Sequence, residues 1–124
     1  MSDWTAAELD RIGAADELQI AALRPDGSLR PATTIWVVRV GDDLYVRSWR
    51  GRGSGWFRSV LRRPEGQVGA GGVTREVAFE EPGDADHDAI DQAYRSKYGR
   101  YGSDYVDPMV GPDATAATLR LVAR

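Results

Sequence analysis

The stretch TTIWVVRVGDDLYVRSW, residues 33–49, decides the fold. Its first half, Thr33 to Val40, is β-branched and aromatic almost throughout, which predicts a central strand covered on both faces. Gly41-Asp42-Asp43 turns the chain into a second run, Leu44 to Trp49, and the two runs predict a β-hairpin. Because side chains alternate along a strand, Tyr45, Arg47 and Trp49 share one face of the second run.

Patterns on either side of this hairpin supply the remaining elements. A helix is predicted over residues 4–14, with Thr5 as its N-cap, and a second over residues 55–63, with Ser54 as its N-cap. A third helix is predicted over residues 85–98. Further strands are predicted over 18–22, 67–70, 73–81 and 115–122, and residues 99–114 are predicted to form a loop. Because the hairpins are too short for parallel crossovers, the sequence predicts an α+β fold, a six-stranded, mostly antiparallel split β-barrel with three helices.

Length and composition narrow the class of protein. A chain of 124 residues fits one domain, residues 1–124, with a core that needs no staples. No apolar run approaches the roughly 20 residues of a membrane span, and the N-terminus lacks a signal-peptide pattern, so we expect a cytoplasmic protein without a membrane partner. The absence of Cys excludes disulfides, thiolate metal sites and a Cys nucleophile.

The charges are segregated along the chain. Residues 44–64 carry six arginines and no acid, whereas residues 76–91 carry seven acids and no Lys or Arg. An arginine cluster in an acidic protein favours a local anion site. The net charge of −3 and a single lysine, Lys97, make nucleic acid an unlikely partner.

Few residues stand out as candidates for chemistry. Arg47, between two aromatic residues, is expected either to stack on them and clamp an anion or to form an exposed pair with an acid. The glycine-rich loop 51–55 opens a helix and could hold a phosphate, the alternative being a solvated loop. The one histidine, His87, is expected to be an exposed surface residue, and no metal site is predicted. Tyr101 and Tyr105 are expected to line a pocket or an interface.

The segment from Leu44 to Gly72 resembles the flavin and deazaflavin split barrels, especially the deazaflavin-dependent nitroreductases. Both have a strand, a Ser/Gly-rich loop, an aromatic helix stopped by proline, a short strand and a Gly-Gly turn. The hairpin with Gly27, Arg30 and Thr33 lies where those enzymes place a Gly/Arg/Lys hairpin, although their Gly-Arg-x-Ser-Gly signature is replaced here by Pro25-Asp26-Gly27-Ser28-Leu29-Arg30.

Over the whole chain the sequence resembles a bacterial family of unknown function, number 2255. The resemblance is carried by Trp4, Glu8-Leu9, Leu18-Gln19-Ile20, Arg24, Asp26-Gly27, Thr34-Ile35-Trp36, Leu44-Tyr45-Val46-Arg47, Trp56-Phe57, Ala70-Gly71-Gly72, Phe79-Glu80 and Asp91-Gln92-Ala93-Tyr94-Arg95-Ser96-Lys97-Tyr98.

These resemblances imply an oxidoreductase-like protein that binds FMN or a deazaflavin and acts on a small molecule. Thr33, Thr34 and Trp36 would then line the cofactor ring, Arg47, Ser48, Arg52 and Ser54 would hold its phosphate, and Tyr101 and Tyr105 would contact the substrate. Trp56 is also assigned to cofactor binding, the alternative being core packing together with Phe57. The group also implies a homodimer with the cleft at its interface. The alternative is a cofactor-free barrel that binds a small anionic metabolite or a protein partner. The sequence identifies no catalytic residue.

Overall fold

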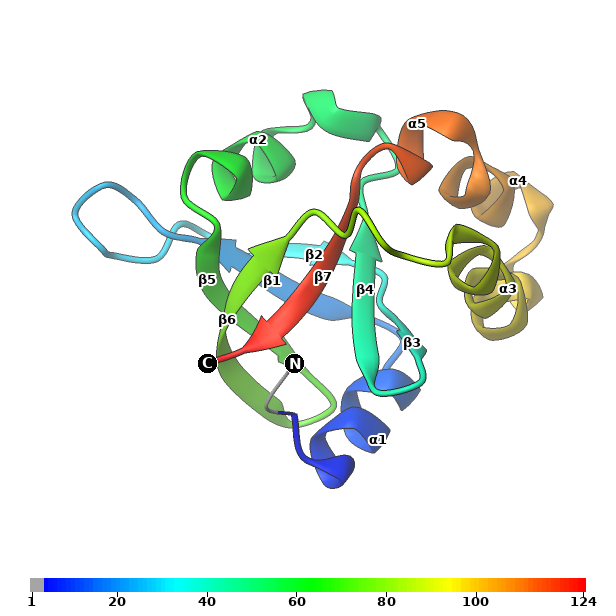
Figure 1. The fold of residues 1–124 in the computed structure, drawn as a ribbon, viewed down its shortest axis with the longest axis horizontal. Coiled ribbons are helices and arrows are strands. Elements are labelled where there is room, and N and C mark those ends of the chain that lie inside the picture. Colours follow the sequence, from blue (N-terminus) through cyan, green and yellow to red (C-terminus); the bar gives the residue numbers. More distant parts are fainter. Residues whose placement is uncertain (1–3) are drawn as a thin grey trace.

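The computed structural model describes residues 4–124, and its centre is one curled antiparallel sheet of seven strands (Figure 1). The strands are β1 (Leu18–Ala22), β2 (Thr33–Ile35), β3 (Val38–Val40), β4 (Asp43–Arg47), β5 (Glu65–Ala70), β6 (Val73–Glu80) and β7 (Thr118–Ala123). Their order across the sheet is β2-β1-β5-β6-β7-β4-β3, and every pairing is antiparallel. The α+β class and the curled antiparallel sheet are therefore as predicted, but the number of strands is seven, not six.

The two edges of this sheet are consecutive pieces of one chain segment. β2 pairs only with β1 at one edge, and β3 pairs only with β4 at the other. Between them the chain runs through Trp36 and Val37 outside any ladder. The sheet therefore curls until its edge strands β2 and β3 lie next to each other in the chain. They are joined by residues 36–37 and not by hydrogen bonds between the two strands.

The prediction of one central strand over 33–40 was wrong in this respect. Its β-branched composition does form extended chain, but the segment bends at residues 36–37 and serves both edges of the sheet. Hydrophobic periodicity predicts only which residues are buried. That part of the prediction is right, because Val37 and Val38 are both buried, on opposite faces. The break is set by tertiary contacts that sequence periodicity does not report.

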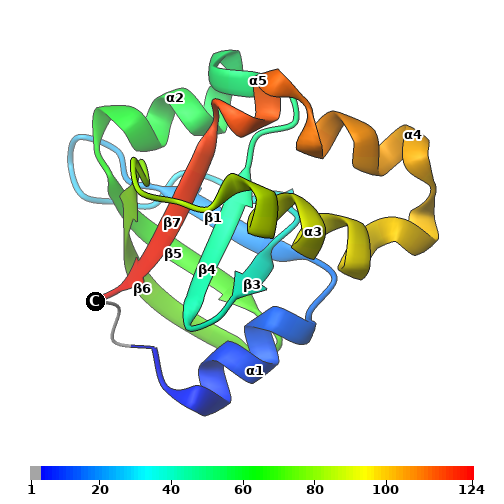
Figure 2. The same cartoon turned by 45° about the vertical axis from the view of Figure 1, so that its right-hand side comes forward.

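Helices cover the ends and one outer face of the curled sheet (Figure 2). The α-helices are α1 (Ala6–Ala14), α2 (Gly55–Arg62), α3 (His87–Tyr98), α4 (Ser103–Val106) and α5 (Pro112–Thr115), with 3₁₀ turns η1 (Gly51–Gly53), η2 (Gly99–Tyr101) and η3 (Asp107–Val110). The described residues thus form five helices, not three. The two additional ones are single turns inside the predicted loop 99–114, too short to show a helical period. None of the helices within residues 4–124 is long and apolar enough to cross a membrane.

Two hydrophobic clusters hold the layers together. The larger fills the curled sheet and includes Ile12 of α1, Phe57 of α2 and the inward side chains Leu44 and Val46 of β4. The smaller lies between the outer face of β3 and β4 and the helices α3 and α4 with η3, and its members are Val38, Tyr45, Ile90, Tyr94, Tyr98, Val106 and Met109. The alternation predicted for residues 44–47 is confirmed, because Tyr45 faces the outer cluster while its neighbours face the inner one.

One glycine in β5 allows two strands to approach closely. A Cβ on Gly66 would lie 2.2 Å from the carbonyl oxygen of Ala21, whereas a Cβ on Gly69 of the same strand would meet nothing closer than 3.7 Å. Gly66→Ala should therefore destabilise the fold by about 2 kcal/mol or more, in the range of overpacked core substitutions. Gly69→Ala is the matched control and should change stability by less than about 0.5 kcal/mol. Urea denaturation measures both, and equal effects would contradict the close approach.

Candidate functional site

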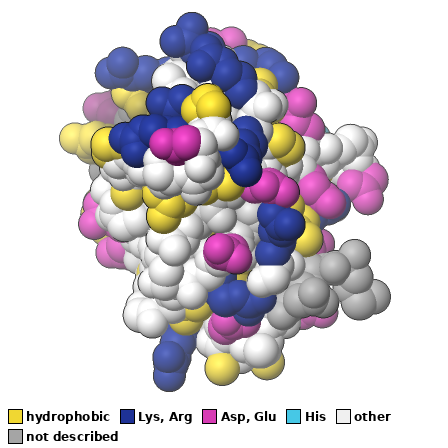
Figure 3. All heavy atoms as spheres, turned by 90° about the vertical axis from the view of Figure 1, so that its left-hand side faces the viewer, with side chains coloured by type: hydrophobic (Ala, Val, Ile, Leu, Met, Phe, Trp, Pro, Cys, Tyr) yellow, Lys and Arg dark blue, Asp and Glu magenta, His cyan; other side chains and the backbone are white. Residues whose placement is uncertain are grey.

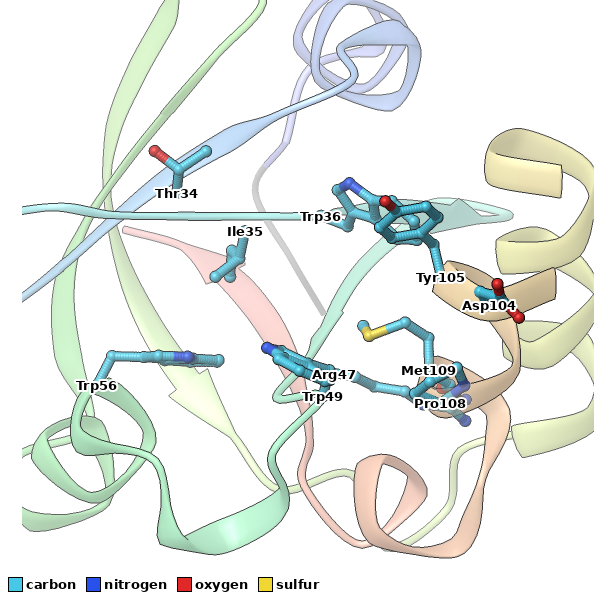
Figure 4. A pocket seen from close by; sticks show the side chains of 10 residues that line it. All are labelled: Thr34, Ile35, Trp36, Arg47, Trp49, Trp56, Asp104, Tyr105, Pro108 and Met109. Carbon is cyan, nitrogen blue, oxygen red and sulfur yellow. Dashed lines mark hydrogen bonds between the residues drawn. The ribbon is translucent and has the colours of Figure 1, made fainter. Parts of the chain in front are cut away.

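A cavity of about 290 Å³ opens where the sheet is split (Figure 4). Its walls come from four places in the chain: the connection between β2 and β3, the end of β4, the first turn of α2, and the segment from α4 to η3. The lining residues are Thr34, Ile35, Trp36, Arg47, Trp49, Trp56, Asp104, Tyr105, Pro108 and Met109. We call this cavity the tryptophan pocket.

Its three tryptophans differ in how firmly they are held. Trp36 stacks on the ring of Tyr98, with centroids 3.9 Å apart and planes within 2°. Trp56 packs edge-on against the buried ring of Phe57, at 5.6 Å and 80°. Trp49 is 59% exposed at the rim, with the guanidinium of Arg50 at 5.3 Å from its ring. Two aromatic walls are therefore fixed by the core, and the third lies at the mouth.

Helix α3 fixes the position of Trp36 through the backbone of its neighbour. The amide of Val37 donates to the Tyr98 hydroxyl at 3.1 Å, and Lys97 Nζ donates to the Val37 carbonyl at 2.7 Å. The Tyr98 hydroxyl also lies 2.8 Å from the Asp16 carbonyl and 3.0 Å from that of Val37. Burial raises the pKa of Tyr98 and lowers the pKa of Lys97 to about 8. These two side chains supply the hydrogen bonds that the ladder lacks at the break.

Arg47 lies behind the pocket with its charge fully enclosed. Its side chain is 0% exposed, and Nη1 bonds to Asp91 Oδ1 at 2.5 Å and to the Met109 carbonyl at 2.9 Å. Nε donates to Thr118 Oγ1 at 3.0 Å, and Nη2 lies 3.2 Å from His87 Nδ1. An arginine buried this deeply needs such partners, because an unpaired charge in the interior is strongly destabilising.

This geometry corrects two predictions made at Arg47 and His87. Arg47 forms an ion pair with an acid, but the pair is interior and not exposed, because α3 and η3 cover that face of β4. His87 is half-buried against the guanidinium and not a free surface residue. Within residues 4–124, no group of three His, Asp or Glu side chains is placed to hold a metal ion.

The residues predicted to hold a phosphate are only partly available. The hydroxyls of Ser48 and Ser54 lie 2.8 Å apart, so the structure brings these two predicted residues together. Ser54 stands at the N-cap of α2, but its side chain makes no capping bond to that helix. Arg52 pairs with Glu81 at 2.5 Å and donates to the Ala116 carbonyl at 2.9 Å. Its guanidinium, like that of Arg47, is already engaged by the chain's own oxygen atoms.

Of the other predicted site residues, Thr34, Trp36, Trp56 and Tyr105 line the tryptophan pocket. Tyr101 lines a neighbouring cavity of about 400 Å³, which shares Trp36 and Tyr105 with the pocket. Thr33 lines a different cavity, which shares Trp56 with the tryptophan pocket.

Sequence reasoning did not assign the following pocket residues to the site: Ile35, Trp49, Asp104, Pro108 and Met109. Asp104, Pro108 and Met109 come from the segment predicted as a loop. Its apolar residues Val106 and Met109, which are buried, were the available signal that this segment packs on the barrel.

The fold and the pocket define a split-barrel protein with an aromatic cleft at the split. The model of an uncharacterized family conserved in bacteria, DUF2255, matches residues 8–121, and the chain belongs to this family. The predicted family is thus confirmed. No curated protein matches the sequence.

Solved structures share the fold at low sequence identity. The conserved hypothetical protein Rv2991 from Mycobacterium tuberculosis is 21% identical, with a TM-score of 0.64 over 99% of this chain and 82% of that one. A FAD-binding protein from Mesorhizobium loti is 16% identical, with a TM-score of 0.57 over 98% and 91% of the two chains. An F420 reductase is 16% identical, with a TM-score of 0.53 over 94% and 90%. At these identities the likeness establishes the fold alone.

The ion pair between Arg47 and Asp91 gives a prediction about stability. Asp91→Ala leaves the enclosed guanidinium without its counter-charge, so the free energy of unfolding should fall by about 3 kcal/mol, as when a buried pair loses one partner. Asp88→Ala, in the exposed first turn of the same helix, is the control and should cost less than about 1 kcal/mol. Chemical denaturation of both variants measures the difference, and a similar small loss in each would refute the structural role of the pair.

Proposed function

We propose that this protein binds a flavin or deazaflavin with its ring system in the tryptophan pocket, and that it serves as a reductase-type domain acting on a small molecule. The observation that carries the proposal is the convergence of Trp36, Trp49 and Trp56 from three separate segments on one cavity. Aromatic faces stack favourably on a planar ring system. The fold shared with FAD-binding and F420-reducing proteins supports the same class of ligand.

A bound flavin would itself supply the hydride or electron transfer, so the chain needs to supply placement and electrostatics. Trp36, clamped by Tyr98, is a rigid wall for the ring, and Trp56 is the opposing aromatic surface, with Thr34 lining the same cavity. Tyr105, shared with the neighbouring cavity that Tyr101 lines, is placed to contact a substrate beside the ring. No side chain in the pocket is proposed as an acid or base.

The alternative function is a cofactor-free barrel that binds a small anionic metabolite or a protein partner. One observation favours it: Arg47 and Arg52, which the resemblance assigned to a cofactor phosphate, are paired with Asp91 and Glu81. A phosphate at either position would have to compete with a carboxylate already bound there.

A homodimer is the second part of the proposal. The tryptophan pocket, at about 290 Å³, lies at the lower limit of the roughly 300–1,000 Å³ typical of small-molecule sites. Trp49 and Tyr105 are 59% and 66% exposed at its rim. Aromatic residues and arginine are enriched at the centres of protein interfaces. A second copy of the chain packed on this rim would deepen the pocket and cover both rings.

Titration with FMN and with a deazaflavin, followed by absorbance and tryptophan fluorescence, tests the cofactor proposal. We expect micromolar binding of one of them. Trp56→Ala should weaken binding tenfold or more, since stacking of a ring on an aromatic side chain contributes about 1–3 kcal/mol. Leu61→Ala, exposed on the same helix, should leave the affinity within twofold. If the wild-type protein binds neither compound at tens of micromolar, the cofactor proposal fails and the alternative stands.

Light scattering tests the dimer. At about 10 µM the protein should have twice the 13.6 kDa mass of one chain if the interface reaches the usual total of about 1,600 Å². Trp49→Glu places a charge at the rim and should give the monomer mass. Leu29→Glu, exposed on the hairpin that precedes β2, should remain dimeric. A wild-type mass of 13.6 kDa at this concentration would exclude the proposed interface.

A further inference from the structure

A smaller cavity of about 200 Å³ shares Trp56 with the tryptophan pocket. It is formed by β1, by the chain leading into β2, and by α2. The lining residues are Ile20, Ala22, Arg30, Pro31, Thr33, Trp56, Ser59 and Val60. Because Trp56 lines both cavities, the two are neighbours.

Arg30 is the one charged residue among those that line this cavity, and no carboxylate of the described residues forms an ion pair with it. Its Nε is buried and has no hydrogen-bond partner within the described chain, and its guanidinium belongs to no ion pair there. Its backbone amide donates to the Ala22 carbonyl at 2.8 Å, which ties the residue to β1. A buried guanidinium nitrogen left without an acceptor is destabilising, so an acceptor from outside the described chain, either water or a ligand, would stabilise it.

Two other residues of the lining, Thr33 and Ser59, carry hydroxyls that can donate hydrogen bonds to an anion. The side-chain hydroxyls of Thr33 and Ser59 make no hydrogen bond to another part of residues 4–124, and no carboxylate lines the cavity. Four other cavities on the described surface each include at least one carboxylate. Lys and Arg side chains gather on the upper half of the molecular face seen in Figure 3, with an acidic side chain among them. Arg58, next to Ser59 on α2, is exposed and without an ion pair among the described residues.

We propose that Arg30, with the Thr33 and Ser59 hydroxyls, forms an anion subsite for the phosphate group of the ligand whose ring occupies the tryptophan pocket. A cavity of about 200 Å³ is too small for a whole ligand of the usual size and suits a single anionic group. The subsite shares Trp56 with the pocket and takes the place of the phosphate site at Arg47 and Arg52, whose guanidinium groups are engaged by acids. This assignment rests on the proposed function for the identity of the ring.

FMN and riboflavin differ only in the phosphate, and comparing their affinities isolates the subsite. The wild-type protein should bind FMN at least tenfold more tightly than riboflavin. Arg30→Met, which keeps the bulk and removes the charge, should reduce that ratio below about threefold while leaving riboflavin affinity within twofold. Arg30→Lys should retain part of the preference. Arg52→Ala and the exposed Arg62→Ala are controls and should keep the wild-type ratio.

The outcomes separate this inference from the proposed function. If Arg30→Met keeps the full preference for FMN, or Arg52→Ala abolishes it, the subsite is wrong although flavin binding stands. If the wild-type protein binds neither of these flavins nor a deazaflavin, the proposed function fails, and inorganic phosphate becomes the probe. In ¹H–¹⁵N spectra of the wild-type protein the Arg30 Nε–H signal should then shift saturably with phosphate and not with chloride at equal ionic strength. Absence of that shift overturns the anion subsite, whether or not the variants fold.

Discussion

The structure depends on one constraint: the two edge strands of the sheet, β2 and β3, are consecutive parts of one chain segment. Because β2 and β3 pair with strands at opposite edges, the chain must leave the ladder between them, and the backbone of Val37 loses its β-sheet partners. Tyr98 and Lys97 replace those partners from α3. The same helix stacks Tyr98 on Trp36, so the contact that closes the barrel also orients the wall of the pocket. The contacts of α3 that close the sheet therefore also fix the geometry of the tryptophan pocket.

In this fold, arginines of the basic segment form ion pairs with acids of the acidic segment. The arginine-rich segment 44–64 and the acid-rich segment 76–91 meet in space, through Arg47 with Asp91 and Arg52 with Glu81. The enclosed pair ties β4 to α3, whereas the exposed pair is expected to contribute little. A cluster of like charges in sequence was therefore a weak guide to an anion site. Arg30, which lies outside that cluster, has a buried Nε with no hydrogen-bond partner among residues 4–124.

Local sequence patterns predicted those features that local physics determines. The capping box of Thr5 and Glu8, the turn at Gly71-Gly72 and the alternation along β4 follow from hydrogen bonds and periodicities within a few residues, and all are present. The bend at Trp36, the burial of Arg47 and the packing of Met109 under the pocket depend on contacts with α3 and η3, far away in sequence. A single sequence does not show which distant residues make such contacts, which is why half of the pocket was missed.

Trp56 lines two cavities of different character. The tryptophan pocket includes three tryptophans, a tyrosine and a methionine, whereas the smaller cavity adds an arginine and two hydroxyls to an otherwise apolar lining. Stacking discriminates poorly between planar rings, since any ring offers a face, whereas a guanidinium favours an anion through charge-assisted hydrogen bonds. In the proposed arrangement the tryptophan pocket provides contact area and Arg30 provides selectivity. Trp56 lies in the first turn of α2, close to Ser54, whose hydroxyl lies 2.8 Å from that of Ser48 after the end of β4.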